Sequence, residues 1–181
     1  MEDIQTNPEE QITEQQPSGP QLSQEKFNQY IAELKREQNL PMAILVGLIA
    51  SLIGAALWAV ITIAAEYQIG FMAVGVGLLV GFSVRSAGKG IDKSYGIIGA
   101  VLSIFGCLLG NYLTVIGMIG KYTGLGFTTT FTTIDMGSIP SLMSETFQPI
   151  DILFYGIAVY EGYKFSFRRI TEQEILQNAA V

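Results

Sequence analysis

The chain contains no histidine and one cysteine, Cys107, among its 181 residues. Without imidazole, histidine-bound zinc, histidine-ligated haem and histidine-based acid–base catalysis are excluded. A single cysteine forms neither an intrachain disulfide nor a cysteine metal cluster. We also find no Ser/His/Asp set, no paired catalytic carboxylates and no run of metal ligands. The sequence therefore predicts a protein that is not an enzyme and that holds no cofactor and no metal.

Charge is scarce as well. Charged residues make up 14% of the chain, against about 25% in an ordinary soluble domain. Eleven of the 26 charged residues fall in the first 40 positions, and positions 41–120 carry five, namely Glu66, Arg85, Lys89, Asp92 and Lys93. A water-exposed surface cannot be covered with so few charges, so we expect a lipid bilayer as the surrounding solvent. The net charge of −6, with no basic stripe interleaved with aromatic residues, argues against nucleic acid as a partner.

The N-terminal part is polar. Residues 1–20 are rich in Gln, Glu and Pro without an apolar period, which predicts a disordered acidic tail. Residues 21–40 predict a cytoplasmic amphipathic helix next to the membrane, because apolar residues recur at three- and four-residue spacing. These residues are Phe27, Tyr30, Ile31 and Leu34. Their shared face would lie on the lipid surface or on the membrane helices, or would dock a membrane or cytoplasmic protein partner. The segment lacks the order of a signal peptide, so the first apolar run is expected to be retained.

Four apolar runs follow within a predicted membrane domain, residues 41–164. They are residues 42–65, 67–84, 96–120 and 147–163. The first has 24 uncharged positions, about 36 Å of helix, which is enough to cross a hydrocarbon core of about 30 Å. The fourth is weaker, because it carries Asp151 and Glu161 near its ends. Residues 165–181 are expected to form a cytoplasmic C-terminal tail.

The basic residues favour four crossings. With four spans, nine of the ten Lys and Arg residues fall on the side of the two termini, and only Lys121 falls on the other side. With three spans the division becomes six to four. The positive-inside rule therefore predicts an all-α, polytopic membrane protein with four transmembrane helices in two hairpins and with both termini cytoplasmic.

The predicted connections differ in length. The link between the first two runs is very short, which predicts a tight antiparallel hairpin. Residues 121–146 are expected to form a long loop with a Thr-rich stretch, ending in a short interfacial helix over the sequence SIPSLMSET.

Small residues recur every three to four positions along the apolar runs. Such rows let helix backbones approach closely in lipid, either within one bundle or between copies in a homo-oligomer. The predicted packing residues are Gly47, Ser51, Gly54, Ala73, Gly77, Gly81, Gly99, Ser103, Gly106 and Gly110. Runs one and three also align at an offset of 52 residues. This pattern suggests an internal duplication of a hairpin, or a chance match between runs of similar composition.

Two groups of polar residues stand out. The first is predicted at the outer ends of the spans and contains Glu66, Gln68, Asn111 and Asp151. It would line an outward-facing vestibule for a cation or proton, or would mark the membrane edge with Asn111 bonding across helices. The second is predicted at the cytoplasmic face and contains Arg85, Lys89, Lys93, Lys164, Arg168 and Arg169. It would contact anionic lipid headgroups, or a specific lipid or partner.

The glycine spacing of residues 70–77, of Val80-Gly81-Phe82-Ser83-Val84-Arg85, of Gly88-Lys89-Gly90 and of residues 95–100 and 106–111 resembles that of small, uncharacterised bacterial inner-membrane proteins. In that family, a multi-span module follows a variable soluble N-terminal segment. The resemblance covers roughly residues 42–120. It implies the bacterial cytoplasmic membrane as the location and brings no catalytic residue with it.

Taken together, these features predict a non-enzymatic scaffold or accessory subunit of a membrane complex. The alternative is a small oligomeric transporter or channel subunit for a cation or small solute, with Glu66, Asn111 and Asp151 along its path. A fainter third option is an enzyme that acts on lipid headgroups at the basic face, for which the sequence offers no catalytic residue.

Overall fold

The computed structural model describes residues 23–67 and 69–179, and these residues form helices joined by short connections, with no strand. The all-α prediction is confirmed. The elements are α1 (Gln24–Arg36), α2 (Leu40–Ala65), α3 (Met72–Gly88), α4 (Lys93–Thr123), α5 (Gly126–Thr133), the 3-10 turn η1 (Met136–Ser138), α6 (Ile139–Thr146), α7 (Pro149–Phe165) and α8 (Glu172–Ala179). The predicted disordered tail, residues 1–20, lies outside the described residues.

The chain divides into two compact units, Met1–Tyr30 with Ile170–Val181, and Ile31–Arg169. In the first unit, α8 begins with a reciprocal cap. The backbone N–H of Thr171 donates to the Glu174 carboxylate at 3.0 Å, and the backbone N–H of Glu174 donates to the Thr171 hydroxyl at 3.3 Å. This arrangement satisfies backbone donors that the first helical turn leaves open, so the predicted C-terminal tail holds a short capped helix.

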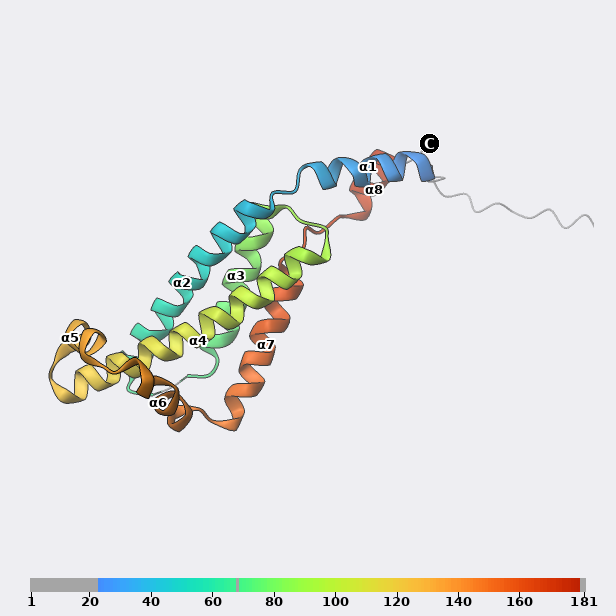
Figure 1. The fold of residues 1–181 in the computed structure, drawn as a ribbon. Coiled ribbons are helices and arrows are strands. Elements are labelled where there is room, and N and C mark those ends of the chain that lie inside the picture. The colour runs from blue at the N-terminus through green and yellow to red at the C-terminus, as the bar shows by residue number, and fades with distance from the viewer. Residues whose placement is uncertain (1–22, 68, 180–181) are drawn as a thin grey trace, which may run out of the picture. The chain divides into compact units, whose positions relative to one another are not determined.

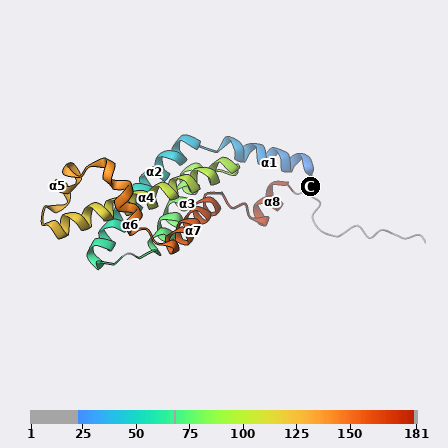
Figure 2. The same ribbon diagram turned by 60° about the horizontal axis from the view of Figure 1, so that its bottom comes forward.

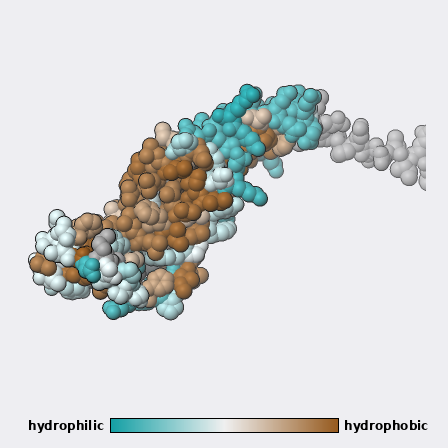
Figure 3. All heavy atoms as spheres, in the orientation of Figure 1, coloured by the Kyte–Doolittle hydropathy of each residue, from teal (hydrophilic) through white to brown (hydrophobic). Residues whose placement is uncertain are grey.

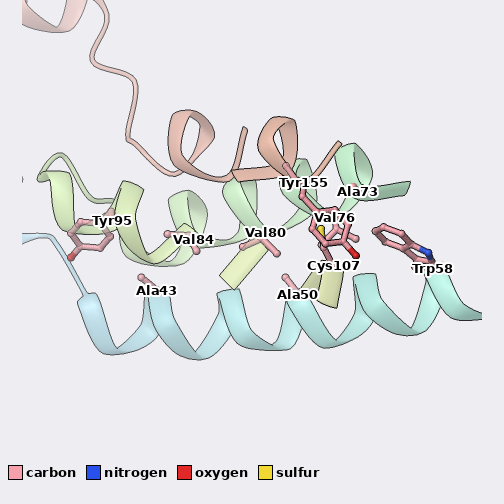
Figure 4. Close-up of a cluster of buried hydrophobic side chains, with 11 residues drawn as sticks. Ala43, Ala50, Trp58, Ala73, Val76, Val80, Val84, Tyr95, Cys107 and Tyr155 are labelled. Carbon is pink, nitrogen blue, oxygen red and sulfur yellow. The ribbon is translucent and has the colours of Figure 1, made fainter. Parts of the chain in front are cut away.

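The second unit is built around four helices, α2, α3, α4 and α7 (Figures 1 and 2). α3 and α4 each pack against the other three helices of this bundle. The core runs along the bundle from Tyr95 at one end to Trp58 at the other, with Val84, Val80 and Val76 between them (Figure 4). The helical-bundle prediction is therefore confirmed.

The bundle buries small residues and exposes large ones. On α2 the buried side consists of Ala43, Gly47, Ala50, Ser51, Gly54, Ala55, Trp58, Ala59 and Thr62. The exposed side of the same helix carries Ile44, Leu45, Leu48, Ile49, Leu52, Ile53, Leu57, Val60 and Ile61. α4 follows the same pattern, so the outer surface of the bundle is strongly apolar (Figure 3). A contiguous apolar surface of this kind is unusual for a protein in water and marks a surface that contacts lipid or protein.

Two helices are long and apolar enough to cross a membrane. They are α2, with 26 residues, and α4, with 31 residues, and only 39% of the most apolar stretch of each is buried. α3 and α7 have 17 residues each, about 25 Å of helix, which is slightly less than a hydrocarbon core of about 30 Å. The first and third predicted spans thus correspond to helices that meet the length requirement, while the second and fourth do not meet it alone.

The predicted second span begins too early. Residues 67–84 were expected to be helical, whereas α3 begins at Met72, and Glu66–Phe71 form a six-residue connection instead of a tight hairpin. The backbone of Glu66 adopts a left-handed conformation, with φ of 55°, which ends α2. The N–H groups of Met72 and Ala73 then bond to the carbonyls of Ile69 and Gly70, which starts α3 anew. The uncharged run after Glu66 does not mark this boundary, because the residues between Tyr67 and Met72 are as uncharged as those of α3.

The expected Thr-rich loop is also a helix. α5 covers Gly126–Thr133, and within it threonine hydroxyls find partners in carbonyls one turn earlier, as from Thr130 to Gly126 at 2.9 Å. Phe127 and Phe131, four residues apart, stack with ring centroids 6.1 Å apart. The expected short helix over SIPSLMSET is confirmed as α6, and α5 and α6 both pack against α4.

Candidate functional site

The predicted small residues lie where the bundle helices cross. A Cβ placed on Gly77 of α3 would lie 2.6 Å from the carbonyl oxygen of Ala158 on α7. Gly106 of α4 similarly faces the Ser51 hydroxyl of α2, at 2.8 Å from a Cβ. These crossings leave no room for side chains, so the interior of the bundle is closed where they occur.

The other predicted packing residues lie at further crossings. Gly47 faces Val84, Gly54 faces Val76, Gly81 faces Phe165, Gly99 faces Gly162 and Ser166, and Gly110 faces Trp58. Ala73 is fully buried in the core. The Ser51 hydroxyl donates across the helix pair to the Leu102 carbonyl at 2.6 Å, while the Ser103 hydroxyl bonds within its own helix to Gly99 at 2.7 Å.

The predicted polar layer is only partly brought together. Glu66 accepts a hydrogen bond from Lys121 at 2.6 Å, which joins the end of α2 to the last turns of α4. Asp151 is buried, and its carboxylate accepts the backbone N–H of Gln148 at 2.8 Å, which caps α7. Asn111 is buried in the middle of α4. Gln68 lies outside the described residues.

Several cavities open at this end of the bundle, and two of them include Glu66. The first, of about 450 Å³, lies between α2, α4 and α6 and includes Glu66, Asn111 and Glu145. The second, of about 480 Å³, lies between the α2–α3 connection and the start of α7 and includes Glu66 and Asp151. Asn111 and Asp151 therefore line different cavities, and Glu66 lies at the edge of both.

The same part of the bundle contains buried polar atoms. The indole Nε1 of Trp58 and the hydroxyl of Thr62 find no hydrogen-bond partner among the described residues. The Asn111 side chain lies within hydrogen-bonding reach of the Tyr155 hydroxyl, and the Asp151 carboxylate is close enough to act on it through its charge. The sequence analysis did not single out Trp58, Thr62 or Tyr155 as site residues. The four-residue spacing of Trp58 and Thr62 nevertheless predicts that both lie on one face of a helix.

The opposite end of the bundle carries the predicted basic group. Arg168 and Lys89 both lie near the Glu37 carboxylate, at 2.8 and 3.9 Å. Lys164 lies over the ring of Tyr160 and Arg169 over the ring of Phe165, at 5.3 and 5.9 Å from the centroids. Arg85 lies in the last turn of α3, and Lys93 is the exposed first residue of α4. The basic residues thus gather at one end, partly neutralised by Glu37.

The apolar face of α1 is largely covered. Tyr30 and Leu34 are 8% and 3% exposed, and Phe27 and Ile31 are half-buried.

Among the described residues no group of three or more Cys, Asp or Glu side chains is placed to hold a metal ion. Comparison of the chain with protein-family models, with curated proteins and with solved structures finds no match.

Proposed function

We propose that the chain is an integral protein of the bacterial cytoplasmic membrane, with four spans and cytoplasmic termini, that acts as a non-enzymatic scaffold or accessory subunit. The observation that carries the proposal is the reversed distribution of side-chain size. Small residues lie where the helices cross, beside a core that also holds Trp58 and several valines, while leucine, isoleucine and phenylalanine cover much of the outside of the bundle. In lipid, helices associate through such close backbone contacts, since large apolar residues gain nothing from leaving the hydrocarbon.

Contacts between the ends of the helices support two further crossings, by α3 and α7, beside those of α2 and α4. The backbone N–H of Asn39, before α2, donates to the carbonyl of Gly88, at the end of α3, at 3.0 Å. At the other end, Glu66 contacts Lys121. If α2 crosses the bilayer, α3 must return across it, because α3 begins a short connection after the end of α2 and ends beside the start of α2.

The same reasoning applies to α7. Its first turns lie beside the start of α3, where the rings of Phe154 and Phe71 have centroids 5.8 Å apart. Beyond its last turn, the backbone N–H of Arg168 donates to the carbonyl of Gly90 at 2.8 Å, at the opposite end. Each short helix, of roughly 25 Å, would then cross with the bilayer beside it adjusting to that length.

The charges give the bundle a direction. Lys89, Lys93 and Arg168 lie at the end that holds the start of α2, and Lys121 lies at the other. Since positively charged residues are retained on the cytoplasmic side, this asymmetry supports cytoplasmic termini.

We prefer the scaffold role to the transporter role because two predicted polar residues, Asn111 and Asp151, do not share a cavity. A transport path needs polar groups that face one another across one cavity. Asn111 and Asp151 line separate cavities, and the Asp151 carboxylate caps α7.

The topology is tested with single cysteines in a Cys107→Ala background, using a membrane-impermeant maleimide on spheroplasts. Thr128→Cys in α5 is expected to react from outside, whereas Ser86→Cys and Gln173→Cys react only after lysis. A protein that crosses with α2 and α4 alone would give the reverse result for Ser86→Cys and Thr128→Cys. A protein in which α7 fails to cross would expose Gln173→Cys outside.

The scaffold role is tested by affinity purification from native membranes. The full chain is expected to bring a partner in fixed stoichiometry, and a chain without residues 22–38 should lose that partner while it still inserts. Recovery of the full chain alone, under conditions that preserve other membrane complexes, would contradict the role.

A further inference from the structure

A groove of about 490 Å³ lies on the surface of the bundle between α2 and α4, next to α5. Alanines hollow it out on α2, where Ala56, Ala59 and Ala64 lie among larger apolar side chains. It follows α2 from Ala56 to Ala64 and α4 from Leu113 to Lys121, about 12 Å of each helix. Every described residue that lines it is apolar except Lys121. A long apolar groove of this kind fits one extended hydrocarbon chain.

The groove ends at a pair of opposite charges. The Lys121 ammonium group donates to the Glu66 carboxylate at 2.6 Å and to the Ile63 carbonyl at 3.3 Å. These bonds use two of its three N–H groups, and a carboxylate can accept several hydrogen bonds. The side chains of Lys121 and Glu66 are 42% and 57% exposed. Both charges are therefore accessible to a further partner from outside the bundle.

Two tyrosines flank this ion pair. Tyr67 follows Glu66 and Tyr122 follows Lys121, and both tyrosine side chains are 71% exposed. Exposed tyrosine is typical of the boundary between hydrocarbon and water, because its ring is apolar and its hydroxyl is polar. Phe127 of α5, which packs against the end of α4 (Figure 1), lines the groove at the same end. On the proposed membrane location, the ion pair lies at the depth of lipid headgroups and the groove at the depth of acyl chains.

We propose that this groove binds one phosphatidylethanolamine molecule of the outer leaflet, with the phosphate on Lys121, the primary ammonium group on Glu66 and one acyl chain in the groove. The headgroup is a zwitterion, and the ion pair offers an opposite charge to each half of it. The ammonium group can donate hydrogen bonds to the carboxylate, which the trimethylated ammonium of phosphatidylcholine cannot do. The inference rests on the membrane location in the proposed function and adds a ligand to it.

The headgroup assignment is tested by native mass spectrometry of the full chain in detergent. Phosphatidylethanolamine and phosphatidylcholine with identical acyl chains are added in turn, so that the two lipids differ only in the ammonium N–H groups. We expect phosphatidylethanolamine to bind about fivefold more tightly, which is the factor that one net hydrogen bond supplies. Equal affinities for the two lipids would overturn the proposal.

Two variants separate the charges. Lys121→Gln is expected to weaken both lipids, because both carry the phosphate. Glu66→Gln is expected to remove most of the preference for phosphatidylethanolamine, because the ammonium N–H groups lose their charged acceptor. A purely structural ion pair would make Glu66→Gln weaken both lipids by the same factor, and that result would overturn the proposal.

The position of the acyl chain is tested by filling the groove. Ala56 is exposed on α2 and lines the groove, so Ala56→Phe places a ring there without entering the core. This variant is expected to bind phosphatidylethanolamine at least fivefold more weakly. Ala65→Phe is the matched control, because Ala65 is also exposed on α2 but does not line the groove. Equal binding by the two variants would contradict the placement of the chain.

The same preparations distinguish this inference from the membrane proposal. A chain that is extracted into the aqueous fraction without detergent would contradict the membrane location and the lipid site together. A chain that stays in the membrane but binds the two lipids equally would contradict the lipid site alone.

Discussion

The ammonium group of Lys121 lies 2.6 Å from a carboxylate oxygen of Glu66. The same ammonium group also donates to the carbonyl of Ile63 at 3.3 Å. Lys121 thus binds the last turn of α2 twice, once through a side chain and once through a carbonyl that the end of the helix leaves open. The one basic residue predicted outside the cytoplasm therefore has a structural contact of its own.

This ion pair predicts a shifted titration. Lys121 lowers the pKa of the Glu66 carboxyl below its ordinary value of 4.5, first through the hydrogen bond and then through its charge. Because the pKa is lowered in the folded state, the stabilisation is present above 4.5 and is lost as the pH falls through the folded-state value. A carbon-13 NMR titration of labelled glutamate should show the shift, and Lys121→Gln should return the Glu66 pKa toward 4.5. An unchanged Glu66 pKa in Lys121→Gln would contradict the ion pair.

The crossing of α3 and α7 predicts a strong effect of one methyl group. Gly77→Ala places a Cβ 2.6 Å from the backbone of Ala158, which has no flexible end to move aside. We expect a loss of about 1–3 kcal/mol in the free energy of unfolding, measured by titration with a denaturing detergent. Gly75→Ala is the matched control on the same helix, because its Cβ would meet no atom within 4 Å. That control should be neutral or more stable by up to about 1 kcal/mol. Equal effects of the two variants would argue against close packing at Gly77.

The start of α2 predicts a capping effect. The side-chain oxygen of Asn39 accepts the backbone N–H of Met42 at 3.0 Å, and Pro41 occupies the first turn, where its missing N–H costs nothing. Asn39→Ala should lower the free energy of unfolding by about 1 kcal/mol, measured as above. Asn39→Asp keeps an acceptor and adds a negative charge at the helix N-terminus, so it should match or exceed the unmodified chain. A loss with Asn39→Asp as large as that with Asn39→Ala would contradict the cap.

The basic end predicts binding of anionic lipid. Lys93 and Arg169 are exposed and make no salt bridge with the described residues. The double variant Lys93→Gln, Arg169→Gln should bind phosphatidylglycerol more weakly in native mass spectrometry, by about fivefold for each charge, which corresponds to about 1 kcal/mol per residue. Lys121→Gln, at the opposite end, should leave this binding unchanged if the interaction is local. If Lys121→Gln weakened lipid binding as much per charge as the double variant does, the binding would depend on net charge alone, and the prediction of a local site would be wrong.

The sequence predicted the bundle well because its signals are local and periodic. Scarce charge and long apolar runs locate α2 and α4 within a few residues, and small residues spaced by one turn locate the crossings at Gly77 and Gly106. The boundaries of α3 were harder to predict from the sequence. A left-handed residue at Glu66 and a helix that begins with backbone bonds at Met72 leave no mark in hydropathy.

The polar interior was harder to predict than the fold. Asn111 stands out in any apolar run, but nothing in the sequence connects it with Tyr155, which lies 44 positions later and on another helix. Thr62 reads as an ordinary threonine near a helix end. It becomes informative only when the partners of every neighbouring hydroxyl are known.

The suggested duplication agrees with two contacts. Gly47 of α2 lies against Val84 of α3, and Gly99 of α4 lies against Ser166 of α7. Gly47 and Gly99 are related by the offset of 52 residues, and the two partners lie in the similar sequences Phe82-Ser83-Val84-Arg85 and Phe165-Ser166-Phe167-Arg168. The two partners are neighbouring and not equivalent positions of these motifs, because Val84 corresponds to Phe167 and Ser166 corresponds to Ser83, so the duplication stays a hypothesis.

The 17-residue length of α3 and α7 has a consequence for the lipid around the protein. Their roughly 25 Å fall short of a bilayer core of about 30 Å. On the proposed topology, acyl chains beside these two helices must tilt or compress, while those beside α2 and α4 need not. The protein would then thin the membrane on one flank, and it should unfold at higher denaturant in bilayers of shorter acyl chains.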